Sequence, residues 1–131
     1  MRVPHWPEVL ASKIEEWRHV PFEYGSCDCF QFPADVVLAI TGVDYREQFA
    51  NYASREEAEA LMTVHRGVLG IIAKALGPSK PVAHAMRADL IAADFGYGLA
   101  AGICLGTHCC APGPAGLVFK PTCEAIAAWS T

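Results

Sequence analysis

The sequence has few charged residues, and its arginines are scattered along the chain. Asp, Glu, Lys and Arg together make up 18% of the 131 residues, and the formal net charge is −4. A general nucleic-acid-binding protein needs a basic surface that neutralises phosphates, so this composition argues against that class and we expect no nucleic-acid partner. Hydrophobic residues make up 53% of the chain, which is enough for a buried core and untypical of a disordered protein.

The sequence also lacks an apolar stretch long enough to cross a bilayer. The Ala-rich region 94–105 is interrupted by glycines and is shorter than the roughly 20 residues that a membrane helix needs. Residues 1–7 contain no apolar run before a cleavage site, so we expect no signal peptide and no membrane span. No internal repeat is present. The length predicts a single domain, 1–131, made in the cytoplasm.

The first half of the chain has helical patterns. Apolar residues at helical spacing predict a helix at 7–19, within an N-terminal region 1–20. A loop followed by an apolar helix occupies 21–42. A capping box at Ser54 and a Gly-Pro pair at Gly77 delimit further helices, which together form a helical insertion at 43–78.

Strand-like patterns follow in the second half. Runs at 89–93, 98–105 and 117–119 predict a small antiparallel sheet within residues 85–121. The Pro- and Gly-rich segment 106–116 is predicted to be a loop, and residues 122–131 a short C-terminal helix. Helices followed by a sheet predict the α+β class.

The segment 21–42 holds two of the six cysteines. Asp28 occupies an N-cap position, which predicts Cys29 in the first turn of a helix that ends at Gly42. The positive end of a helix dipole favours the thiolate, which is the form that attacks carbonyls or binds metal. The charge of Asp28 acts in the opposite direction, so position alone leaves the reactivity of Cys29 open.

The six cysteines allow a structural interpretation and a metal-binding interpretation. Cys104 and Cys123 are predicted to be small buried apolar residues, since free cysteine is commonly buried. A structural thiolate site for zinc or an iron–sulfur cluster is the other interpretation. It needs the segment 106–116 to fold back over the start of the helix, and its ligand spacing differs from that of paired Cys-x₂-Cys motifs. Its candidate ligands are Cys27, Cys29, Cys109 and Cys110.

Several motifs stand in a fixed order along nearly the whole chain. They are the segment from Trp17 to Phe22, the segment from Gly25 to Asp35, Thr41-Gly42-Val43-Asp44, the segment from Gly102 to Gly106, and Ala128-Trp129. Their order and spacing resemble a family of small phage and prophage tail proteins related to the NlpC-type, papain-like cysteine peptidases. The resemblance implies a papain-like core, in which a nucleophile helix packs on a small sheet. It also implies a place in the virion tail, with other tail-tip or hub proteins as partners.

The same resemblance assigns roles around Cys29. It makes Cys29 the nucleophile and matches Tyr24 to a family tyrosine beside it. In the peptidases the general base is a histidine that opens a strand of the form His-Val-Gly-Ile, and Ala100 stands in that place here. A general base contributes roughly 10²–10⁴-fold to such a reaction. The resemblance therefore implies a tail-tip assembly protein that has lost the usual base.

An enzymatic alternative stays open beside the metal site. An active cysteine peptidase or amidase that acts on bacterial cell-wall peptide would use Cys29 as its nucleophile. His108, just beyond the strand at 98–105, is the first candidate base, and His84 is the second.

Overall fold

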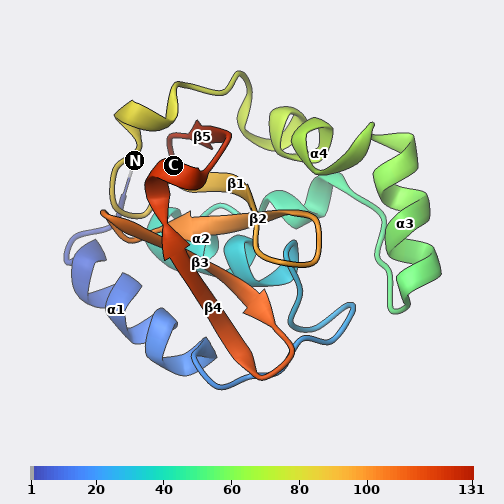
Figure 1. The fold of residues 1–131 in the computed structure, drawn as a ribbon, viewed down its shortest axis with the longest axis horizontal. Coiled ribbons are helices and arrows are strands. Elements are labelled where there is room, and N and C mark those ends of the chain that lie inside the picture. Colours follow the sequence, from blue (N-terminus) through green and yellow to red (C-terminus); the bar gives the residue numbers. More distant parts are fainter. Residues whose placement is uncertain (1) are drawn as a thin grey trace.

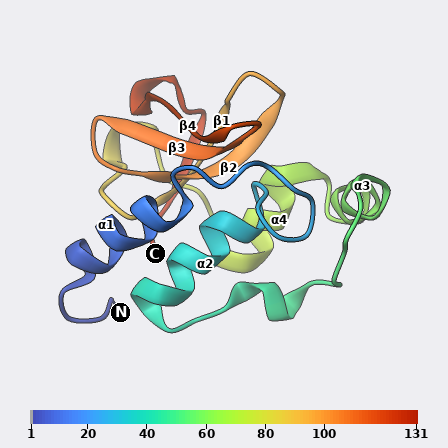
Figure 2. The same ribbon diagram turned by 90° about the horizontal axis from the view of Figure 1, so that it is seen from below.

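Residues 2–131, which the computed structural model describes, form four α-helices and one five-stranded antiparallel sheet. In Figure 1 the strands lie in the order β4-β3-β2-β1-β5, and Figure 2 shows α1 and α2 beneath one face of the sheet. The predicted α+β class is confirmed. The helices are α1 (Trp6–Trp17), α2 (Gln31–Thr41), α3 (Arg55–Val64) and α4 (Gly67–Leu76), with short 3₁₀ turns at Tyr45–Gln48, Val82–His84 and Thr122–Glu124. The strands are β1 (Leu90–Asp94), β2 (Leu99–Cys104), β3 (His108–Gly113), β4 (Gly116–Pro121) and β5 (Ala127–Trp129).

Local signals in the sequence set the ends of the helices. The Ser54 hydroxyl accepts the backbone N–H of Glu57 at 3.2 Å and caps α3, which confirms the capping box. Gly42 ends α2 in the left-handed conformation with φ of 80°, and its N–H bonds to the Leu38 carbonyl. Gly77 follows the last residue of α4 with a φ of 85°, and its N–H bonds to the Ala73 carbonyl. Residues 43–78 thus hold two α-helices and a 3₁₀ turn.

Helix α2 is the centre of the main hydrophobic core. Phe32, Val36 and Ile40 on this helix are each exposed by 1% or less. The helix packs against α1 on one side and against β2 and β3 on the other. Since successive side chains of a strand point to opposite faces, β2 divides between two clusters. Ala101 and Ile103 face the main core, whereas Ala100 and Cys104 belong to a smaller cluster.

Two predictions for the last third of the chain are wrong. The predicted loop 106–116 contains β3, which pairs with both β2 and β4. The predicted C-terminal helix at 122–131 is only a 3₁₀ turn, and β5 after it pairs with the free edge of β1. Cys, Ala, Pro and Gly have little intrinsic preference for strands. Neighbouring strands therefore decide the structure of both segments.

The two ends of the described chain lie side by side, as the terminal labels in Figure 1 show. The Arg2 guanidinium contacts the buried carboxylate of Asp89 at 3.0 Å and the Thr131 hydroxyl at 3.2 Å. The Lys80 ammonium contacts the second oxygen of Asp89 at 2.6 Å. Within residues 2–131, no helix has the length and apolar character needed to cross a membrane.

Candidate functional site

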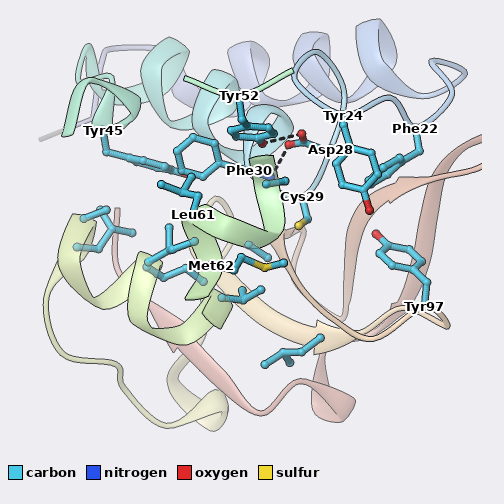
Figure 3. Close-up of a pocket in the computed structure, with 18 residues that line it drawn as sticks. Phe22, Tyr24, Asp28, Cys29, Phe30, Tyr45, Tyr52, Leu61, Met62 and Tyr97 are labelled. Carbon is cyan, nitrogen blue, oxygen red and sulfur yellow. Dashed lines mark hydrogen bonds between the residues drawn. The ribbon is translucent and has the colours of Figure 1, made fainter. Parts of the chain in front are cut away.

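A mostly apolar cavity of about 150 Å³ lies beside Cys29. Its walls come from four parts of the chain: the turn before α2, the segment that leads into α3, the α3–α4 pair, and β2 with the loop before it. Figure 3 shows the side chains converging on this space. The helical insertion thus supplies one side of the cavity, and the central helix supplies the cysteine.

Asp28 holds together the turn that carries Cys29. Its Oδ1 accepts the backbone N–H groups of Phe30 at 2.9 Å and Gln31 at 2.8 Å. Its Oδ2 accepts the Gly25 N–H at 2.9 Å. These bonds satisfy N–H groups that a helix start leaves unpaired. The Asp28 carboxylate therefore holds the turn before α2, whereas the N-cap position itself falls at Phe30, so the prediction of Asp28 as the N-cap is wrong by two residues.

The regular part of α2 begins two residues later than Cys29. The helix runs from Gln31, so Cys29 lies in the turn that leads into it and not in its first turn. The bond from the Phe32 N–H to the Asp28 carbonyl already has helical spacing. The prediction that Cys29 lies in the first turn of the helix is therefore wrong by two residues.

The Cys29 thiol is not activated by its surroundings. Its sulfur points into the cavity between Tyr24 and Met62 (Figure 3). Burial raises the pKa of this thiol to about 11, and the charge of Asp28 adds to the effect. The backbone N–H of Ala101 and that of Cys29 itself lower the pKa by less. About one thiol in 10⁴ is ionised at pH 7 with such a pKa.

No histidine lines the cavity among the residues that the structure describes. His108 is exposed at the start of β3, where its ring nitrogen lies 3.2 Å from the Thr107 hydroxyl. His84 is exposed in the turn before β1. The structure therefore does not bring either candidate base into the cavity with Cys29.

Ala100, which stands where the family has its catalytic histidine, does not line the cavity. Ala100 is fully buried in the smaller cluster, which Cys29 also contacts. The wall itself is formed by its neighbours in β2, Leu99 and Ala101. Position 100 therefore contributes packing rather than a polar group.

Tyr24 lies where the resemblance implies, in the cavity wall with Cys29. Its ring packs edge-on against Phe22 with centroids 4.9 Å apart. The Tyr24 hydroxyl points toward that of Tyr97 in Figure 3, and the Tyr97 hydroxyl donates to the Pro112 carbonyl. Burial raises the pKa of Tyr97, so its hydroxyl stays protonated.

The sequence predictions missed part of this wall. Tyr97 stands between two glycines, in a loop that carries no motif. Tyr52 precedes the capping box, and its aromatic ring was the only signal that could have marked it. Leu61 and Met62 follow the ordinary apolar pattern of a helix. Their place in the same cavity wall as Cys29 depends on how α3 packs, which a local pattern does not encode.

The four candidate metal ligands do not gather at one point. Cys109 and Cys110 are neighbours in β3, so their side chains lie on opposite faces of the sheet, in the smaller cluster and the main core respectively. The Cys27 thiol is buried and faces the Val20 carbonyl at 3.7 Å. Within residues 2–131, no three His, Cys, Asp or Glu side chains are arranged to hold a metal ion.

All six cysteines are free thiols. Cys104 is buried, as predicted, and its sulfur lies 3.4 Å from the Gly106 nitrogen. Cys123 is exposed in the turn after β4, so the prediction that it is buried is wrong.

Together, fold and site define an α+β protein with an apolar cavity at the N-terminal end of its central helix and a neutral cysteine in the cavity wall. The chain belongs to the family described as "Domain of unknown function (DUF6950)", which matches residues 1–131. No curated protein matches the sequence.

Proposed function

We propose that this protein is a phage or prophage tail-tip or hub-associated assembly protein that keeps a papain-like, NlpC-type core and has lost the usual catalytic base. The order of motifs along the chain supports the tail family. One observation supports the loss of catalysis. The Cys29 thiol lies in an apolar cavity that no histidine among residues 2–131 lines, and its pKa is raised to about 11.

In the part of the chain that the structure describes, the Cys29 sulfur lacks the neighbours that a nucleophilic thiol needs. The thiolate is the nucleophile, and peptidases obtain it by placing a base or a positive charge beside the sulfur. Here the first charged neighbour is the Asp28 carboxylate, which disfavours the thiolate. The site is better suited to contact than to acyl transfer.

The reactivity of the thiol tests this part of the proposal. Iodoacetamide is added at pH 7.5, and mass spectrometry follows the peptides that contain Cys29 and the exposed Cys123. We expect Cys29 to react at least about tenfold more slowly than Cys123. Faster reaction at Cys29 would show an activated nucleophile and contradict the proposal.

A genetic experiment tests the role in the tail. A prophage that encodes Cys29→Ser is compared with one that lacks the whole protein. We expect normal tails with the substitution and defective tails after the deletion, scored by electron microscopy and plating. Normal tails after the deletion would refute the assembly role, and a defect with the substitution alone would point to catalysis.

A cell-wall amidase or peptidase is the second candidate. It is favoured by the shared position of Tyr24 and Cys29 in one cavity at the start of the central helix. Digestion of purified peptidoglycan by the wild type, Cys29→Ala, His108→Ala and His84→Ala separates the two functions. The enzyme would be supported if the wild type releases peptide and if this release is lost both in Cys29→Ala and in one of the two histidine variants.

A further inference from the structure

The inner wall of the Cys29 cavity is aliphatic on one side and aromatic on the other. Helices α3 and α4 provide the aliphatic side chains Leu61, Met62, Val68, Ile71, Ile72 and Leu76. Phe30, Tyr45 and Tyr52 lie opposite. A cavity of about 150 Å³ lined by Leu, Ile and Phe takes up benzene, so a space of this size and lining suits one apolar ring or branched chain.

The polar groups around the cavity are already occupied or neutral. Among residues 2–131, Asp28 is the only Asp or Glu in the wall, and its two oxygens accept four hydrogen bonds. The wall contains no Lys, Arg or His among the described residues. Cys29 is protonated at neutral pH. A charged group that entered would lose its water and find no partner, which strongly disfavours its binding.

We infer that this cavity is a binding site for an uncharged apolar group, about the size of a benzene ring or a leucine side chain. Cys29 serves there as a neutral wall contact. The inference rests on the proposed function, since it takes Cys29 as non-catalytic. Tyr97 and Leu99, exposed by 46% and 38%, extend the apolar surface outside the cavity. The group is either a free small molecule or a side chain of a bound protein segment.

Toluene is a suitable probe, and benzoate is its charged counterpart. Each is titrated into ¹⁵N-labelled full-length protein, and amide shifts are followed by NMR. We expect saturable shifts with toluene near Cys29 and Ala101, and binding of benzoate at least about tenfold weaker. Absence of saturable toluene shifts, or equal binding of benzoate, would overturn the inference.

Cavity-filling variants provide the matched control. Ala75 lines the cavity from α4, whereas Ala73 on the same helix is exposed and outside it. We expect Ala75→Leu to weaken toluene binding at least about tenfold and Ala73→Leu to leave it unchanged. Ala101→Val fills the opposite wall if Ala75→Leu fails to fold. A folded filling variant that binds toluene like the wild type would overturn the inference.

The outcomes separate this inference from the function beneath it. No toluene binding together with an inert Cys29 overturns the ligand site alone. A fast-reacting Cys29 overturns the proposed function and the neutral role of Cys29 in the wall, even if toluene still binds. Organic extraction of protein from its host distinguishes the sources. A molecule recovered from the wild type and not from Ala75→Leu identifies a free ligand. If no small molecule is recovered, displacement of a co-purified tail protein by toluene identifies a side chain of that protein as the group in the cavity.

Discussion

The Tyr52 hydroxyl donates a 2.6 Å hydrogen bond to Asp28 Oδ2, which ties the segment before α3 to the turn that carries Cys29. The two segments also touch through the backbone. A Cβ atom at Gly25, whose φ is +87°, would lie 2.8 Å from the Tyr52 carbonyl oxygen. The glycine therefore allows the close approach on which this hydrogen bond depends.

Replacing Tyr52 with Phe removes one donor from a buried carboxylate and leaves the ring in place. We expect the free energy of unfolding to fall by about 1.5–3 kcal/mol, the range for hydrogen bonds to charged groups, measured by urea denaturation. Tyr24→Phe is the matched control, because no hydrogen bond of its hydroxyl is seen in residues 2–131. An equal loss in both variants would show that the Tyr52–Asp28 bond contributes nothing specific.

Alkaline pH is expected to destabilise the fold through its buried thiols. Burial raises the pKa of Cys110, which has no exposed surface, from 9.0 to about 12. Between these two pKa values the unfolded chain loses the proton and the folded chain keeps it. The contribution of this thiol to the free energy of unfolding is therefore fully present below pH 9 and is lost as the pH rises toward 12. Each pH unit costs about 1.4 kcal/mol for such a thiol.

Thermal melting from pH 8 to 10.5 measures this effect. We expect the melting temperature to fall steadily above pH 9, and the fall to be smaller in Cys110→Ala. Cys123→Ser, at an exposed position, should leave the slope unchanged. A slope that does not differ between Cys110→Ala and the wild type would refute this explanation.

Asp89 anchors Arg2, near the start of the chain, and Lys80 from a nearly fully buried position. Its carboxylate meets the cations of Arg2 and Lys80. Asp89→Asn leaves both cations without their counter-charge, so we expect a loss of about 3 kcal/mol in urea denaturation. Glu59→Gln breaks the exposed pair with Arg55 and should leave the free energy of unfolding nearly unchanged. Similar losses at the two sites would contradict this account.

The sequence by itself determined the features that depend on near neighbours. The capping box at Ser54 and the end of α2 at Gly42 each involve groups within four residues of one another. Such bonds form whenever the local chain is helical. They could therefore be predicted without knowledge of the rest of the fold.

Only the tertiary structure decided what depends on distant partners. Strands β3 and β5 have weak local preference and exist because β2, β4 and β1 offer edges to pair with. The cavity is lined by Cys29, Met62 and Tyr97, which lie far apart in the chain. The thiol's high pKa comes chiefly from burial at that meeting point. A helix start favours a thiolate at any such cysteine. At this one, burial and the charge of the adjacent Asp28 outweigh the helix; the charge could be read from the sequence, whereas the burial depends on packing.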